Sequence, residues 1–197
     1  MANTSKFNRG DVLRKASDLF WGKGFAGTSI RDIQDTVNMR PGSIYATFGS
    51  KEGLFKESLL NYAGAMERKM DAYIGNAHNP IVGLQQYVEY NIIEGATCHP
   101  SGVCMLFKAS GEFNGQNPAL FQFSQTLLDG FENKVTQIFA DAKQAGFVAE
   151  DFDEANAGQQ FVIQFTGLRN YFNGRNTPEL AKQLIDKMFV NLVNETH

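Results

Sequence analysis

The chain has 197 residues, of which 43% are hydrophobic and 20% charged, a balance typical of a globular protein. Its apolar runs are only a few residues long, which excludes a membrane-spanning helix, and the polar residues 1–8 lack the apolar core of a signal peptide. Two cysteines, Cys98 and Cys104, are too few for a disulfide framework, so we expect a reducing, cytoplasmic setting.

Positive charge is concentrated near the N-terminus. Residues 1–56 carry nine Lys or Arg and five Asp or Glu, a net charge of +4, whereas residues 57–197 carry nine and sixteen, a net charge of −7. A basic first part joined to an acidic body suits a protein whose first part meets phosphate groups.

The N-terminal segment shows three short helical patterns followed by a long one. Asn8 is a suitable N-cap for the first pattern, which ends at Gly22 and Gly24. The second pattern covers 29–37, and the third covers 41–48, with a proline in its first turn. Asn38, between them, tolerates the left-handed backbone that ends a helix. The fourth pattern begins at the cap Ser50 and runs to about residue 74.

One helix-start signal then recurs, in which a capping residue precedes a proline. It occurs at Asn79-Pro80, Asn117-Pro118 and Thr177-Pro178. Two further helices are predicted over 103–113 and 154–172. The whole pattern predicts nine helices and no strand, an all-α fold.

Residues 29–48 have the layout of a helix-turn-helix, in which a short helix, a tight turn and a second short helix follow one another. We expect four apolar side chains to pack the two helices together: Ile33, Val37, Ile44 and Phe48. Four polar side chains are left facing outward and can donate to phosphates or base edges: Arg40, Ser43, Tyr45 and Thr47. Gly42 permits a close approach of backbone to a partner.

Two blocks in this region resemble the tetracycline-repressor (TetR) family. Residues 24–33, GFAGTSIRDI, resemble the start of the family's second helix, and residues 42–54, GSIYATFGSKEGL, resemble its recognition helix and the entry to its fourth. Asn38 stands where the family usually has a turn glycine, and Gln34 where it commonly has a small residue. Because of these differences, the resemblance does not predict the operator sequence.

The resemblance implies a nine-helix TetR-like architecture with a DNA-binding domain over 1–50 and an effector-binding and dimerisation domain over 51–197, linked by the helix at about 50–74. It also implies contacts to double-stranded operator DNA, with Tyr45 and Lys51 meeting phosphates. The residues carried over as DNA-binding are Thr28, Ser29, Arg40, Pro41, Gly42, Ser43, Tyr45, Thr47 and Lys51.

The same resemblance implies a homodimer formed through the helices over 154–172 and 178–194, and therefore a near-palindromic operator. It implies a repressor that a small-molecule effector releases from DNA by shifting the population between two states. The aromatic-rich second domain favours an apolar or aromatic effector. The candidate lining residues are Tyr90, Met105, Phe107, Phe131, Phe161, Gln164, Phe165 and Arg169.

Other signals have less weight. Residues 22–27, GKGFAG, fit a dinucleotide-binding pattern, but that site needs a preceding strand, so the glycines are interpreted as a tight turn. The histidines are scattered, and Cys98, His99 and Cys104 do not have zinc-site spacing. No nucleophile–base pair stands out. We therefore expect no enzyme activity, no metal and no cofactor.

Cys104 leaves one alternative open. It precedes an apolar helix, where the positive helix end lowers a thiol pKa, and the resemblance implies that some family members sense oxidants at a similar place. Packing in the core is the favoured interpretation over redox sensing. A helical small-molecule-binding protein without operator function is the second alternative.

Overall fold

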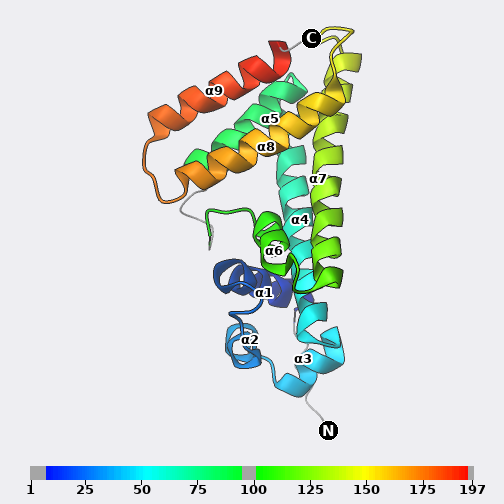
Figure 1. Cartoon of the computed structure of the whole chain (residues 1–197), viewed down its shortest axis with the longest axis vertical. Coiled ribbons are helices and arrows are strands. Elements are labelled where there is room, and N and C mark those ends of the chain that lie inside the picture. Colours follow the sequence, from blue (N-terminus) through cyan, green and yellow to red (C-terminus); the bar gives the residue numbers. More distant parts are fainter. Residues whose placement is uncertain (1–7, 95–100, 195–197) are drawn as a thin grey trace. The chain divides into compact units, whose positions relative to one another are not determined.

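The computed structural model describes residues 8–94 and 101–194, which are helical and contain no strand (Figure 1). Nine α-helices and one π-helical turn lie within these ranges. They are α1 (Arg9–Lys23), α2 (Ile30–Val37), α3 (Pro41–Phe48), α4 (Lys51–Asn76), α5 (Pro80–Glu89), η1 (Tyr90–Glu94), α6 (Met105–Phe113), α7 (Pro118–Gln144), α8 (Glu154–Phe172) and α9 (Pro178–Asn194). The all-α prediction is confirmed, and none of these helices is long and apolar enough to cross a membrane.

The helix starts lie where the capping residues predict them. The Asn8 side chain accepts from the backbone N–H groups of Gly10 and Asp11, and the Asn79 side chain accepts from Ile81 at 2.8 Å. Ser50 accepts from the N–H of Gly53, at the start of α4. Each bond satisfies a backbone donor that the first helical turn leaves without an intrahelical partner.

The π-helical turn η1 is a feature that the sequence did not predict. It directly continues α5, and its Ile92 is buried. A π-turn adds one residue to a turn of a helix, and the spacing of apolar residues across it is still compatible with an ordinary α-helix. Only the backbone hydrogen bonds distinguish the two.

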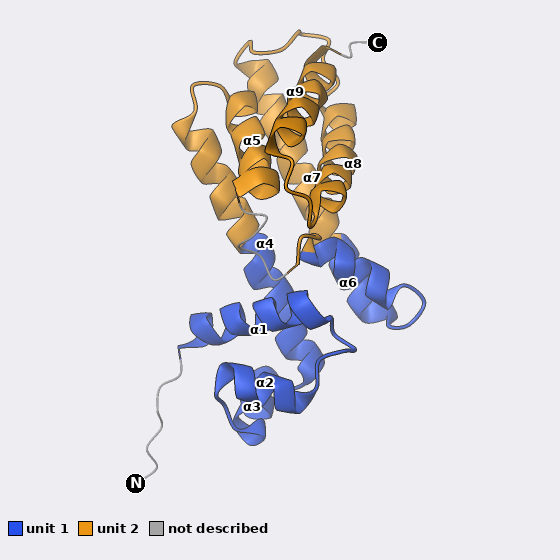
Figure 2. Ribbon diagram, turned by 90° about the vertical axis from the view of Figure 1, so that its left-hand side faces the viewer, with its two compact units in different colours: residues 1–64, 105–125 blue, residues 65–104, 126–197 orange. Residues whose placement is uncertain are grey.

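The chain forms two compact units, shown in different colours in Figure 2. The first contains residues 1–64 and 105–125, and the second contains residues 65–104 and 126–197. The boundaries therefore lie within α4 and α7, and α6 belongs with the N-terminal helices. The predicted domain boundary at residue 50 does not coincide with these points of division. The assignment of DNA binding to residues 1–50 stays a prediction.

The first unit has an aromatic core. Phe55 of α4 contacts Phe20 of α1, Phe25 of the α1–α2 turn and Phe113 of α6, with ring centroids 4.9, 5.1 and 5.4 Å apart. Edge-to-face rings at these distances add to the stability gained from apolar burial. This cluster joins α6 to the helices that surround the turn.

The second unit packs α5, α8 and α9 against one another, side by side in Figure 1. Its core is also aromatic. Phe161 contacts Phe131, Phe165 and Phe189, at centroid distances of 6.4, 5.6 and 6.1 Å. Tyr87 packs beside Phe165 at 6.0 Å. Most of the phenylalanines that enrich this part of the sequence therefore fill the interior.

Candidate nucleic-acid interface

The α2–turn–α3 segment has the geometry of a helix-turn-helix. Asn38 ends α2 in the left-handed conformation, with φ 53° and ψ 46°, and α3 begins three residues later at Pro41. The four apolar residues predicted to lock the helices are all buried. These are Ile33, Val37, Ile44 and Phe48. Their burial leaves the opposite face of α3 to solvent.

The exposed face of α3 carries most of the residues predicted to contact DNA. Arg40, Pro41, Gly42, Ser43 and Tyr45 are exposed. Thr47 is half-buried, and its hydroxyl donates to the carbonyl of Ser43 at 2.7 Å, which leaves the oxygen lone pairs available as acceptors. One guanidinium and several hydroxyls thus share a surface around the first two turns of a helix.

Gly42 has no structural role inside the chain. A Cβ added at this position would meet no other atom within 4 Å. An exposed helical glycine costs roughly 0.5–1 kcal/mol relative to alanine. The open space beside Gly42 leaves room for a close approach to this part of α3, and its contact with DNA stays a prediction.

Ser29 and Thr28 have different environments. Ser29 is exposed and forms a capping box, in which its hydroxyl oxygen accepts from the Asp32 N–H and the Asp32 carboxylate accepts from the Ser29 N–H. Thr28 is 1% exposed, and its hydroxyl donates to the carbonyl of Gly24 at 2.6 Å. Its side chain faces the interior of the unit, so Thr28 supports the turn and does not present its hydroxyl to a partner.

Lys51, at the start of α4, is partly packed. Its Nζ lies 4.2 Å from the centre of the Phe25 ring, a cation–π distance. Burial lowers the pKa of Lys51, and the nearby carboxylates of Glu112 and Asp32 oppose that shift. The Phe25 ring thus holds the ammonium of the half-buried Lys51 in place.

Two residues outside the N-terminal segment also reach this region. Lys108 of α6 donates to backbone carbonyls in the last turn of α1, and Glu112 of α6 accepts from backbone N–H groups in the turn that follows. Each lies 86 or 87 residues from its backbone partner in the sequence, and no local pattern identifies such a contact. The sequence reasoning missed them.

Residues 12–58 match the sequence model of a family described as bacterial regulatory proteins, tetR family. The fold agrees over most of the chain. The TetR family transcriptional regulator CifR, as a cysteine mutant complexed with 26-bp double-strand operator DNA, superposes with a TM-score of 0.79 and 22% identity over 96% of this chain and 98% of that one. The chain has the fold of a TetR-family regulator, and residues 12–58 match that family in sequence.

Other TetR-family structures and curated repressors give similar matches. The TetR-family transcriptional regulator from Cytophaga hutchinsonii superposes with a TM-score of 0.78 and 16% identity over the full length of both chains. The HTH-type transcriptional repressor ComR of Escherichia coli K12 is 35% identical over 68 residues, 34% of this chain and 32% of that protein. The repressor BdcR of the same organism is 39% identical over 59 residues, 30% of each. The match spans about a third of the length of these curated relatives.

The residues predicted to line an effector site are divided between the two compact units of the chain. Met105 and Phe107 belong to the first unit, and the other six belong to the second. Phe131, Phe161 and Phe165 are buried and pack against one another. The prediction of lining residues therefore stays a prediction, although three of the aromatic side chains do lie together.

Polar side chains border this aromatic cluster. Arg169 of α8 is buried, with its guanidinium 5.7 Å from the centre of the Phe165 ring, and Gln164 is half-buried. Tyr90 lies under the ammonium of Lys69, at 3.2 Å. The hydroxyl of Tyr87 is buried without a hydrogen-bond partner of good geometry among the described residues. Burial raises the pKa of Tyr87, and the positive charge of Arg169 and the nearby side chain of Asn91 oppose the rise.

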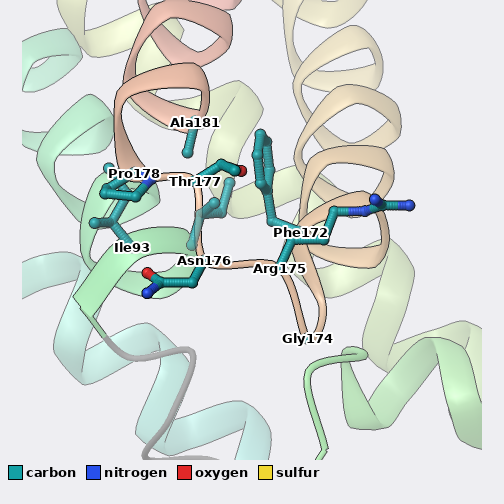
Figure 3. Close-up of a pocket in the computed structure, with 9 residues that line it drawn as sticks. Ile93, Phe172, Gly174, Arg175, Asn176, Thr177, Pro178 and Ala181 are labelled. Carbon is teal, nitrogen blue, oxygen red and sulfur yellow. The ribbon is translucent and has the colours of Figure 1, made fainter.

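A pocket of about 340 Å³ opens elsewhere in the second unit (Figure 3). It lies where η1, the end of α8, the loop after it and the start of α9 meet. Its lining residues are Ile92, Ile93, Phe172, Gly174, Arg175, Asn176, Thr177, Pro178 and Ala181. Figure 3 shows the Arg175 side chain extending away from Ile93 and Pro178, and its guanidinium lies 4.6 Å from the Tyr171 ring. None of the eight predicted lining residues borders this pocket.

Cys104 directly precedes α6 and is buried, with 6% exposure. Cys98 and His99 lie outside the described residues, as does His197. Among the residues that the structure describes, no group of three side chains suited to a metal comes together. The burial of the Cys104 thiol favours core packing over a sensor that must meet oxidants in solution.

Proposed function

We propose that this protein is a sequence-specific DNA-binding transcriptional regulator, a homodimeric repressor that acts in the cytoplasm. The observation that carries the proposal is the exposed face of α3, where polar side chains surround a glycine whose missing side chain nothing in the protein requires. The TetR-family match over residues 12–58 covers the same segment. Similar proteins are named as repressors, which supports repression as the outcome.

Binding would place α3 in the major groove. Its first residues would then meet base edges, because a recognition helix contacts bases mainly through its N-terminal part. Arg40 is suited to a guanine, to which a guanidinium donates two hydrogen bonds. The Ser43 hydroxyl can donate to or accept from a base edge, and the Thr47 oxygen can accept. Tyr45, Lys51 and the N-terminus of α2 at Ser29 would bind phosphates.

Dimerisation is proposed through α8 and α9. Both helices expose large apolar side chains, which a chain that acts alone would place in contact with water. The residues are Ile163 and Tyr171 on α8 and Leu180 and Val190 on α9. Gly167 lies one turn from both Ile163 and Tyr171, and a Cβ there would meet nothing within 4 Å, so a second helix could approach closely. Two copies related by a two-fold axis would read a near-palindrome with half-sites about 34–36 Å apart.

A small-molecule effector is proposed to act through the second unit. Its body would be apolar or aromatic, matching Phe131, Phe161 and Phe165, and it would carry an acceptor such as a carboxylate for the buried Tyr87 hydroxyl. A ligand that binds the DNA-incompetent state more tightly weakens DNA binding by its differential affinity. Such a ligand raises the Tm of the wild type, and Tyr87→Phe, which deletes one hydroxyl, reduces that rise.

Substitutions on α3 test the DNA-binding proposal. Arg40→Ala and Tyr45→Ala each remove an exposed side chain, so the fold should be unaffected. We expect Arg40→Ala to lower operator affinity about 5- to 150-fold by removing base contacts, and Tyr45→Ala to weaken binding to all DNA alike. Arg68→Ala, an exposed arginine of α4 in the other unit, is the matched control. Equal affinities for all four proteins would leave a helical binding protein without operator function.

The thiol-switch alternative has a separate test. In a Cys98→Ser background, Cys104 in the native protein should react with a thiol reagent far more slowly than in the unfolded chain, since it is buried. Rapid native reaction together with loss of DNA binding would instead favour redox control.

A further inference from the structure

Two charged side chains of α6 hold the turn between α1 and α2. The ammonium of Lys108 donates to the carbonyls of Trp21 and Gly22, at 2.7 and 2.8 Å. The carboxylate of Glu112 accepts from the backbone N–H groups of Phe25 at 3.0 Å and Ala26 at 2.6 Å. All of these residues belong to the same compact unit.

The charges of this contact match the backbone they meet. Lys108 binds carbonyls in the last turn of α1, where the helix dipole favours a cation. Glu112 receives two successive N–H groups, an arrangement that favours an anion. Hydrogen bonds to charged groups are about twice as strong as those between neutral groups. The two residues are four positions apart and lie on one face of α6, so a single helix makes both contacts.

The held segment is the glycine pattern over residues 22–27. Gly24 has φ +78°, and a Cβ there would lie 3.0 Å from the nearer Glu112 carboxylate oxygen. Gly27 passes so close to the Lys23 carbonyl that a Cβ would lie 2.5 Å from it. The interpretation as a tight turn is confirmed for Gly24 and Gly27, whereas Gly22 lies within α1, and the turn binds an anion that the chain itself supplies.

The position of this turn determines where α2 begins. The buried Thr28 hydroxyl donates to the Gly24 carbonyl, and the next residue, Ser29, caps α2. The ammonium of Lys23 pairs with Asp32 in the first turn of α2, at 2.6 Å. Since α2 packs on α3, a shift of the turn shifts the recognition helix with it.

We propose that Lys108 and Glu112 are positioning residues for DNA recognition, which hold the α1–α2 turn so that α3 keeps the orientation its base contacts need. This inference rests on the proposed function of α3. It assigns no contact between these two side chains and DNA. Their hydrogen bonds reach the backbone of residues 21–26, and the Glu112 carboxylate also lies near the ammonium of Lys51.

Glu112→Gln distinguishes a positioning role from a purely electrostatic one, because the two roles predict opposite changes in DNA affinity. The substitution removes a negative charge from the unit that binds DNA, so electrostatics alone would tighten binding to every sequence. A glutamine keeps the shape but has one acceptor oxygen, and its amide group would face a backbone N–H. Positioning therefore predicts weaker binding to the operator and no weakening on unrelated DNA.

The experiment measures affinity by fluorescence anisotropy for the operator and for an unrelated duplex of equal length, at several salt concentrations. We expect Glu112→Gln to lose about tenfold in operator affinity, the size of one charged hydrogen bond, with an unchanged salt slope. Lys108→Met should lower the ratio of operator affinity to unrelated-DNA affinity in the same direction. In both variants, hydrogen exchange at the Phe25 and Ala26 amides should accelerate.

Asp129→Asn and Lys134→Met are the matched controls, since they remove the same charges from α7 in the other unit. Their affinity ratios should equal that of the wild type. If Glu112→Gln behaves like Asp129→Asn while the wild type binds its operator, the positioning role is wrong and the proposed function stands. A wild type that selects no operator would overturn the proposed function itself. Lys108→Met repeats the test if the glutamine variant is unstable.

Discussion

At the scale of single residues, the α3 surface combines a glycine with side chains that donate hydrogen bonds. Gly42 is exposed in a helix and has open space where its side chain would be. Glycine makes this helix less stable than alanine would, and the proposed function accounts for it by a close approach of DNA at this position.

Gly42→Ala should separate stability from function. Alanine favours the helix, so we expect the free energy of unfolding to stay equal or rise by up to about 1 kcal/mol. The added methyl group would collide with a closely approaching backbone, so operator affinity should fall several-fold. Thermal unfolding and DNA titration measure the two effects. Gly130→Ala, at an equally open glycine of α7, should gain stability without losing affinity. Equal DNA affinity in the two variants would contradict close approach at Gly42.

Thr28 and Ser29 show which features of a site can be predicted from the sequence alone. Ser29 as an N-cap follows from local spacing, and the capping box is present. Thr28 lies beside it and matches the same family block, yet its side chain is buried against the Gly24 carbonyl. Which of two neighbouring hydroxyls faces solvent depends on how the turn packs, and no local pattern determines that.

At the scale of elements, the helix boundaries were predictable because they depend on a few nearby residues. Capping side chains, prolines in first turns and the left-handed Asn38 set the ends of α2, α3 and α5. The π-turn η1 was not predictable, since its apolar positions fit a regular helix equally well. Local chemistry thus specifies where helices begin more firmly than it specifies their internal hydrogen bonds.

The N-terminus of α2 should make the protein sensitive to acid. The bond from Lys23, aided by those from the Ser29 hydroxyl and N–H, holds the pKa of Asp32 well below its usual range. A carboxyl with a lowered folded-state pKa stabilises the fold above its unfolded pKa, about 3.9, and this contribution is lost as the pH falls towards the folded-state value.

Asp32→Asn removes this dependence. The difference in unfolding free energy between wild type and variant should therefore be constant above about pH 5 and shrink as the pH falls below about 4. Chemical denaturation at a series of pH values measures it. Asp35→Asn, an exposed residue of the same helix, gives the background effect of one lost charge. A difference that stays constant down to pH 2 would mean that the Lys23 and Ser29 bonds do not form in solution.

At the scale of the whole molecule, contacts between residues far apart in the sequence could not be predicted from it. Lys108 and Glu112 reach the α1–α2 turn from α6, and the pocket beside η1 joins segments about 80 residues apart. The all-α class and the helix-turn-helix were predictable because their signals are local and repeated. A pocket depends on which helix faces meet in space. Composition indicates the types of residue that line it, but not which residues these are.

The proposed dimer should separate when charge is placed on its apolar faces. Ile163→Glu combined with Val190→Glu puts carboxylates on side chains that are 64% and 57% exposed in the single chain, so the fold should persist. Sedimentation should show a monomer, and operator affinity should fall about a hundredfold because the second half-site no longer binds as part of the same complex. Leu60→Glu, at a residue 50% exposed on α4, is the control. A double variant that remains dimeric would place the interface elsewhere.

The most direct test of the central claim is a selection of DNA fragments from a genomic library by the purified wild-type protein, read out by sequencing. We expect enrichment of a near-palindrome with half-sites one helical turn apart, and loss of that enrichment in the Arg40→Ala variant. No enriched sequence with the wild type, in protein shown to be folded and dimeric, would contradict it.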